Sequence, residues 1–174
     1  RRQRQMCIRD SANTVQNELQ KCLSILLKKN IELLAKAKNW KTNELTACLL
    51  KRPRHDNIAA ELIKLGVKIK YITDGDVSGV ISVINKKQKV DIYMGFGGGP
   101  EGVLSAAALS CMGWQIQTRL VLDDDQKIRA KKLGITDFKK KYNIDDMVRG
   151  DVIFCATAIT DGDLVPGVKY KDNK

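Results

Sequence analysis

Two pairs of charged residues, each separated by one position, could bind a phosphorylated molecule. Arg52 and Arg54 lie on either side of a proline, and Asp74 and Asp76 lie on either side of a glycine. Guanidinium groups match the oxygens of a phosphate, whereas carboxylates accept hydrogen bonds from sugar hydroxyls or hold a metal ion. If residues 52–54 are extended, both guanidiniums point to the same side and reach one anion.

A glycine-rich loop at residues 95–102, "GFGGGPEG", follows an apolar run and precedes a helical pattern. Gly97, Gly99 and Gly102 satisfy the G-x-G-x-x-G pattern of a dinucleotide-binding turn. Asp123 follows roughly 20 residues later, where such a fold places an acidic residue on the ribose. A dinucleotide-binding oxidoreductase module is therefore an alternative function.

Glu101 lies inside this loop and favours a different ligand. Its carboxylate would repel a pyrophosphate unless a cation stood between them, so it indicates a metal more than a dinucleotide. The helix dipole also favours a carboxylate in a first helical turn, with no ligand at all. Arginines that bind phosphate, aspartates that bind hydroxyls and a Glu101 that faces a metal would together form a site for a phosphorylated polyol.

Each of these motifs also has a simpler structural explanation. The arginines could lie on an exposed loop, and Asp76 could cap the helix that follows it. The second "DGD", residues 161–163, has no basic residue nearby in our interpretation and is predicted to be a turn. His55, the single histidine, lacks a nucleophile motif and is expected to act at a helix entry.

Strands and helices must alternate to position these residues. The predicted class is α/β, with a layered sheet covered by helices on both faces, because alternating strands and helices form parallel or mixed sheets. Asp56 is expected to cap its helix, and Gly66 to end it. Strands are predicted at 45–50, 67–72, 90–96, 114–122 and 151–159, and helices at 15–38, 56–66, 77–84, 100–113 and within 124–149.

Composition narrows the class of protein. The chain has 174 residues, of which 43% are hydrophobic, which suits one domain. Its net charge of +11 comes from scattered lysines, and aromatic residues make up 5%, so a basic nucleic-acid binder is a weaker alternative. Five widely spaced cysteines predict reduced, mostly buried thiols in a cytoplasmic protein. No apolar run approaches the roughly 20 residues of a membrane span.

The first residues differ in character from the rest. Residues 1–11, "RRQRQMCIRDS", carry four arginines and no hydrophobic period. The part "MCIRDS" resembles the translation of a sequencing adapter, and a disordered or basic targeting arm is the alternative. We therefore assign 1–11 to an adapter-derived or disordered segment, and 12–174 to a single α/β domain.

Four ordered motifs resemble the C-terminal part of class II fructose-1,6-bisphosphatase: "RPRHD", "DGDVSGVI", "GFGGGPEGVLSAAAL" and "GDVIFCATAITDGDLVPGV". The resemblance implies a layered sugar-phosphatase fold and a cytoplasmic, Mn²⁺- or Mg²⁺-dependent hydrolase of gluconeogenesis. That family removes the 1-phosphate of fructose 1,6-bisphosphate to give fructose 6-phosphate, and some members use sedoheptulose 1,7-bisphosphate. It also implies a homo-oligomer at full length, with no nucleic-acid or membrane partner.

The resemblance also assigns roles to individual residues. The expected substrate-binding residues surround one molecule, with arginines on its phosphate, the aspartate turn on its sugar and a glycine backbone beside it. They are Arg52, Arg54, Asp74, Gly75, Asp76 and Gly98, and the expected metal ligand is Glu101.

Other motifs of the family are not found in this sequence. Its remaining acidic metal ligands, and the threonine expected to position the attacking water, belong to an N-terminal part with Asp-Asn, Gly-Glu-Gly-Glu and Asp-Pro-x-Glu-Gly-Thr motifs. We therefore expect no catalytic residue in this chain and no phosphatase activity from the chain alone. Gly99 and Ala158 depart from the residues common in the family.

Overall fold

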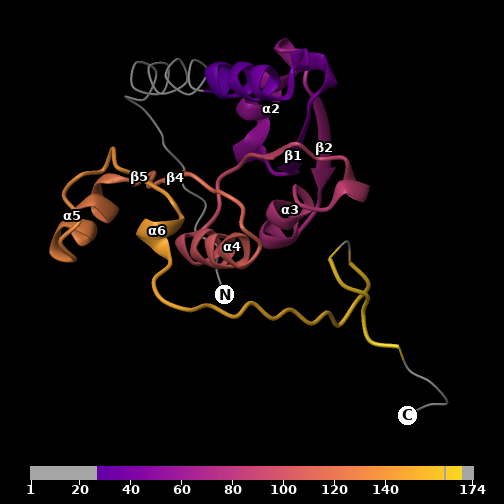
Figure 1. Ribbon diagram of the computed structural model, residues 1–174. Coiled ribbons are helices and arrows are strands. Elements are labelled where there is room, and N and C mark those ends of the chain that lie inside the picture. Colours follow the sequence, from indigo (N-terminus) through magenta and orange to yellow (C-terminus); the bar gives the residue numbers. More distant parts are fainter. Residues whose placement is uncertain (1–26, 163, 170–174) are drawn as a thin grey trace. The chain divides into compact units, whose positions relative to one another are not determined.

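Helices and strands alternate along the chain in the computed structural model, which describes residues 27–162 and 164–169 (Figure 1). This is the α/β class that the sequence predicts. The chain divides into two compact units. Arg1–Thr73 and Val90–Phe96 form the first unit, and Asp74–Lys89 and Gly97–Lys174 form the second. The prediction of one domain over 12–174 stays a prediction.

A three-stranded parallel sheet forms the centre of the first unit. β1 (Thr46–Leu50) lies between β2 (Lys68–Ile72) and β3 (Ile92–Tyr93), and both neighbours are parallel to it. The central position suits β1 because its sequence, TACLL, is almost wholly apolar and buried. Since the strands are parallel, their carboxyl ends meet at one edge of the sheet, and the loops that follow begin there.

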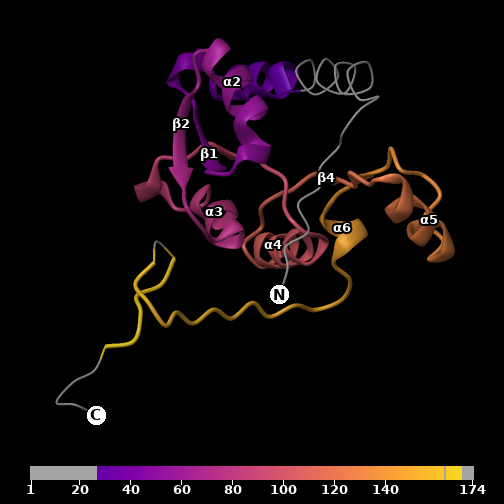
Figure 2. The same cartoon turned by 180° about the vertical axis from the view of Figure 1, so that it is seen from behind.

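Two helical segments pack on this sheet in the first unit, as the two opposite views in Figures 1 and 2 show for α2. Residues 27–38 are helical, and α2 spans Asp56–Lys64. The two helical segments and alternate residues along and beside β1 form one apolar core. Its buried members are Leu27, Ile31, Ala35, Leu45, Ala47, Leu49, Ile58, Ala59, Leu62 and Val67.

Asp91 joins three segments of the first unit through polar contacts. Its carboxylate accepts a hydrogen bond from the Thr46 N–H at 2.8 Å and forms an ion pair with Lys38. The Asp91 N–H in turn donates to the Thr46 carbonyl at 2.9 Å. These contacts fix the approach to β3 against the start of β1 and the end of the preceding helix.

Most of the regular elements in the second unit are helices. α3 (Asp76–Ser82) packs against α4 (Gly99–Cys111), and α6 (Ile144–Met147) also contacts α4. The buried residues of α4 include Ala106 and Ala108, whose small side chains allow close helix packing. The remaining elements are α5 (Asp124–Lys132) and the antiparallel pair β4 (Thr118–Arg119) and β5 (Lys141–Tyr142). Short 3₁₀ turns cover Thr42–Glu44, Pro53–His55 and Lys86–Gln88.

The predicted elements up to α4 are confirmed where the structure describes them, although β3 is shorter than predicted. Residues 1–11 and the first part of the helix predicted at 15–38 lie outside the described residues. Gly66 ends the α2 region with a left-handed φ of 76°, as expected.

Of the two later strand predictions, the one at 114–122 is confirmed only in part, and the one at 151–159 is wrong. Of 114–122, the structure places two residues in β4, and none of 151–159 forms a strand. Ile153 and Ile159 are 90% and 87% exposed. An alternating or apolar sequence becomes a strand only where another strand completes its hydrogen bonds, and residues 151–159 have no such neighbour in the described part. Within 124–149, α5 ends at Lys132, and Gly134 then adopts a φ of 81°. β5 and α6 follow it along the chain.

The prediction that the cysteine thiols are mostly buried is also partly wrong. Cys48 is buried in β1, whereas Cys111 and Cys155 are exposed. Cys7 and Cys22 lie outside the described residues. No helix in the described part of the chain is long and apolar enough to cross a membrane.

The core of the first unit predicts a sharp difference between two adjacent residues of α2. Leu62 is fully buried, whereas the next residue, Ile63, is 64% exposed. Leu62→Ala should lower the free energy of unfolding by about 2–5 kcal/mol through the lost burial and the cavity left behind. Ile63→Ala is the matched control and should change it by about 0.5 kcal/mol or less. Urea unfolding followed by circular dichroism measures both, and similar losses would contradict this core.

Candidate functional site

The arginine pair lies on a tight turn at the carboxyl end of β1. Arg52 has extended backbone angles (φ −143°, ψ 145°), and Pro53–His55 then form a 3₁₀ turn. The His55 N–H closes this turn by donating to the Arg52 carbonyl at 2.9 Å. The condition that 52–54 are extended is therefore not met, because the fixed φ of proline also suits the first position of a helical turn.

Both arginine side chains are exposed, and each makes one hydrogen bond to the backbone. Arg54 donates from Nε to the Phe96 carbonyl at 2.9 Å, and Arg52 donates from Nη1 to the Lys51 carbonyl at 3.0 Å. Among the described residues, nothing binds the two terminal nitrogens of Arg54. A guanidinium held through Nε can still offer this pair of nitrogens to two oxygens of one anion.

His55 connects the arginine turn to the segment after β3. Its ring is buried, with Nδ1 2.7 Å from the Leu50 carbonyl and Nε2 2.8 Å from the Phe96 amide nitrogen. His55 is the N-cap residue of α2 and Asp56 is its first helical residue. The helix-entry role predicted for His55 is confirmed, and the capping role predicted for Asp56 is wrong. Sequence analysis missed the long-range contacts of His55, because a lone histidine carries no pairing pattern.

The first aspartate turn follows β2 directly. Gly75 has left-handed backbone angles (φ 82°, ψ 66°), which favour glycine, and its N–H donates to Asp74 Oδ1 at 2.9 Å. Asp76 is the first residue of α3, and Gly75 is the N-cap without a side-chain cap. The alternative in which Asp76 caps the helix is therefore wrong. Asp74 is exposed and Asp76 is half-buried.

Two of the predicted acidic residues lie near the glycine loop. Gly98 is the N-cap of α4, and Glu101 lies in its first turn. The Glu101 carboxylate folds back over Gly98, where a Cβ would collide with it. A Cβ at Gly97 would lie 3.9 Å from both Asp76 Oδ2 and Glu101 Cβ. Asp76 and Glu101 thus both lie near Gly97 within the second unit.

These two carboxylates do not complete a metal site. Mn²⁺ and Mg²⁺ take about six ligands, most of them oxygens. The part of the chain that the structure describes holds no group of three or more His, Cys, Asp and Glu residues able to bind a metal. Glu101 and Asp76 therefore fit part of a coordination shell and not all of it.

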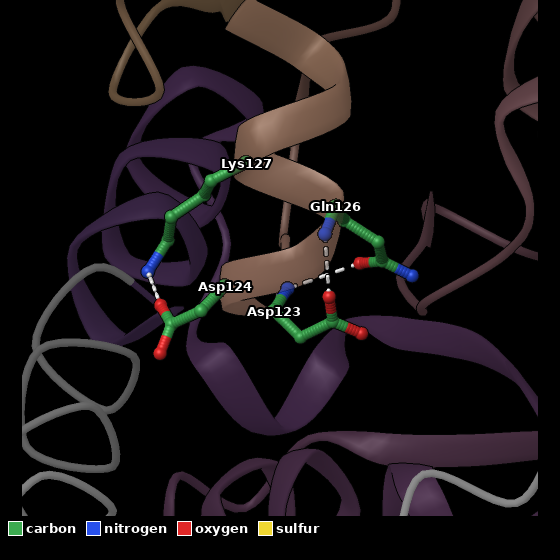
Figure 3. A network of polar contacts seen from close by, with 4 residues as sticks. All are labelled: Asp123, Asp124, Gln126 and Lys127. Carbon is green, nitrogen blue, oxygen red and sulfur yellow. Dashed lines mark hydrogen bonds and ion pairs between the residues drawn. The ribbon is translucent and has the colours of Figure 1, made fainter.

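The dinucleotide alternative fails at Asp123. This residue caps α5: Asp123 Oδ1 accepts from the Gln126 N–H at 2.7 Å, and Gln126 Oε1 accepts from the Asp123 N–H at 3.0 Å (Figure 3). The preceding strand, β4, pairs antiparallel with β5 in a separate sheet. A ribose-binding acid should instead follow a parallel strand beside the one that precedes the glycine loop.

Asp161 and Gly162 of the second "DGD" lie in a turn, as predicted, between Ile159 and Val168, whose backbone groups are hydrogen-bonded at 3.1 Å, whereas Asp163 lies outside the described residues. Asp161 accepts from the Gly167 N–H at 2.8 Å and from Lys169 Nζ at 2.9 Å. The interpretation that no basic residue lies nearby is wrong, because Lys169 folds back across the turn. The hydrogen bond from Lys169, and to a smaller extent that from Gly167, lowers the pKa of Asp161 below its ordinary value.

The predicted residues divide between the two units. Arg52 and Arg54 belong to the first, whereas the aspartate turn, the N-cap of α4 and Glu101 belong to the second. The chain passes between the two units three times, after Thr73, after Lys89 and after Phe96.

The alternation of elements and the parallel sheet define an α/β protein, and sequence comparison identifies its family. Residues 14–174 match the family described as "Bacterial fructose-1,6-bisphosphatase, glpX-encoded". The chain therefore belongs to this family, as its motifs predict.

Curated relatives agree with this assignment. The chain is 34% identical over 156 residues to a protein of Synechococcus sp. (strain JA-3-3Ab). This alignment covers 82% of the chain and 45% of the Synechococcus protein. The chain is 33% identical over 158 residues to a protein of Trichodesmium erythraeum (strain IMS101). That alignment covers 83% of the chain and 46% of the Trichodesmium protein. Both are named D-fructose 1,6-bisphosphatase class 2/sedoheptulose 1,7-bisphosphatase. The chain thus spans less than half the length of these relatives.

Two adjacent glycines test the position of the Glu101 carboxylate. A Cβ at Gly98 would collide with that carboxylate, whereas a Cβ at Gly99 would meet nothing within 4 Å. Gly98→Ala should therefore displace the Glu101 side chain and shift its ¹³Cδ resonance. Gly99→Ala is the matched control and should leave the resonance in place. Equal shifts in the two variants would contradict the fold-back of Glu101.

The turn at Asp161 should loosen in acid. A carboxylate whose pKa is lowered in the folded state stabilises that state above its ordinary pKa of about 3.9, and this contribution is lost as the pH falls through the lower folded value. The Gly167 amide proton should therefore move toward its unbonded chemical shift as the pH falls below about 4. Asp161→Asn should abolish this transition. A Gly167 resonance that titrates identically in the variant would refute the assignment.

Proposed function

We propose that this chain forms the sugar-phosphate-binding part of a bisphosphatase that converts fructose 1,6-bisphosphate to fructose 6-phosphate. The observation that carries the proposal is the family match over residues 14–174, which includes every residue of the predicted site. The names of the curated relatives add sedoheptulose 1,7-bisphosphate as a second substrate. A role in gluconeogenesis, a cytoplasmic location and a homo-oligomeric full-length enzyme belong to the same proposal.

Arg52 and Arg54 bind the phosphate in this proposal. Both are exposed on the turn after β1, and the Nε bond to Phe96 holds Arg54 without using its terminal nitrogens. A hydrogen bond between charged groups contributes about 1.5–3 kcal/mol. The arginine turn is accordingly expected to provide most of the affinity for a phosphate monoester.

The aspartate turn binds the sugar. Asp74 and Asp76 accept hydrogen bonds from hydroxyls, and the left-handed Gly75 sets the direction of the chain between them. The backbone of Gly98 approaches the ligand beside them. Glu101 ligates Mn²⁺ or Mg²⁺, which when bound supplies charge neutralisation and an activated water for phosphate ester hydrolysis.

The isolated chain is proposed to be inactive as a phosphatase. Glu101 is the proposed metal ligand, and the described residues hold no group of three or more His, Cys, Asp and Glu residues that would complete the shell around the metal. Phosphate release from fructose 1,6-bisphosphate with added Mn²⁺ should therefore not exceed that of a Glu101→Ala control. Metal-dependent release above that control would overturn this part of the proposal.

Ligand titration separates the two halves of the proposed site. Arg54→Ala should weaken both inorganic phosphate and fructose 6-phosphate by roughly tenfold to a hundredfold, because a charge-assisted hydrogen bond is lost. Asp74→Ala should weaken fructose 6-phosphate and leave inorganic phosphate unchanged, because only the sugar carries hydroxyls. Dissociation constants from NMR titration of the 174-residue chain provide the measurement.

The control for this titration is Arg129→Ala, which removes an exposed arginine from the last turn of α5 and should leave both affinities unchanged. An equal loss in Arg54→Ala and Arg129→Ala would mean that general positive charge, and not the turn after β1, attracts the anion. Failure of the unaltered chain to bind fructose 6-phosphate would contradict the proposal as a whole.

A further inference from the structure

We propose that His55 is a positioning residue: as the neutral tautomer protonated on Nδ1, it holds Phe96 where Phe96 fixes the Arg54 guanidinium. This inference rests on the proposed function for its consequence, which is the orientation of a phosphate-binding arginine. Its structural part stands on contacts within the first unit.

The hydrogen bonds determine the tautomer. The Phe96 amide nitrogen lies 2.8 Å from Nε2 of His55, and a backbone N–H can only donate. Nε2 must therefore offer its lone pair and carry no proton. In the neutral ring the proton is then on Nδ1, which donates to the Leu50 carbonyl at 2.7 Å. Both ring nitrogens are satisfied inside a side chain that is 1% exposed.

Through these bonds the ring connects the ends of two neighbouring strands. Leu50 is the last residue of β1, and Phe96 lies shortly after β3. The arginines follow β1 directly, and the segment after β3 leads through Gly95, Gly97 and Gly98 into α4. His55 thereby sets the spacing at which both loops leave the sheet.

Phe96 passes this constraint on to Arg54. Its N–H donates to His55, while its carbonyl accepts from Arg54 Nε at 2.9 Å. The same carbonyl lies 3.2 Å from His55 Nε2, which as an unprotonated nitrogen does not compete for it. The tautomer of His55 therefore leaves the Phe96 carbonyl to the guanidinium.

The close approach of the ring depends on Gly95. A Cβ at this position would lie 3.3 Å from both Cε1 and Nε2 of His55 and would press against the ring. The His55 ring also stacks on the Phe96 ring, with centroids 6.0 Å apart and planes inclined by 19°. Gly95 thus belongs to the same arrangement, although it lies outside the G-x-G-x-x-G pattern.

Two substitutions separate the two bonds of the ring. In His55→Gln the side-chain amide oxygen can reach the place of Nε2 and accept from Phe96. In His55→Asn the shorter amide reaches the place of Nδ1 and can donate to Leu50, but it leaves Phe96 without its acceptor. Both variants replace a buried ring by a smaller amide, so similar losses of stability are expected from both, and urea unfolding measures them.

The decisive readouts are spectroscopic and do not depend on ligand. In the unaltered chain, imidazole ¹⁵N shifts should report the tautomer protonated on Nδ1. Hydrogen exchange at the Phe96 amide and at Arg54 Nε–H should accelerate in His55→Asn by about tenfold, the effect of one lost hydrogen bond, and should stay within about threefold in His55→Gln. The fructose 6-phosphate dissociation constant should follow the same order.

Three results would overturn the positioning role. The first is a His55 ring protonated on Nε2 or on both nitrogens. The second is an Arg54 Nε–H that exchanges at the same rate in His55→Asn and in the unaltered chain. The third is hydrogen exchange that accelerates equally in His55→Asn and His55→Gln, in proportion to their lost stability. The unaltered chain could fail to bind fructose 6-phosphate while the exchange rate of Arg54 Nε–H still differs between His55→Asn and His55→Gln. That result would support the positioning of Arg54 and contradict the proposed function.

Discussion

The parallel pairing of β1 with β2 and β3 is the constraint on which the candidate site depends. Parallel strands end at the same edge of a sheet, so one short pairing pattern places the starts of three loops together. Each of those loops carries one of the charged motifs. The apolar sequence of β1 and its core with α2 and residues 27–38 make this pairing stable, because burial on the sheet favours one register.

Local sequence rules predict the first half of the fold well. Residues 45–72 combine an apolar run, an amphipathic helix, a terminating Gly66 and an alternating strand, and each signal agrees with the others. Residues 151–159 show the limit of the same rules. Their composition favours a strand, yet Ile153 and Ile159 remain exposed, because strand formation requires a partner that a local pattern does not specify.

The site was predictable in its residue types and less so in its connections. Arginines after β1, an aspartate turn after β2 and a carboxylate at the start of α4 follow from motif and position. The contact of Asp76 and Glu101 with Gly97 and the bonds of His55 to residues far along the chain do not. They depend on the way loops fold back, and the 3₁₀ turn at Pro53 shows that even a three-residue segment can differ from its simplest conformation.

The backbone hydrogen bonds of Phe96 affect which positions of the sequence selection can act on. Its links to His55 and Arg54 are made by backbone atoms, so they do not require a phenylalanine at this position. Selection for the link therefore acts on position 55, which supplies the acceptor, and on position 95, where a larger side chain would strike the ring. Position 96 can drift among residues that tolerate its surroundings, and a survey of invariant side chains would overlook the peptide at the centre of the arrangement.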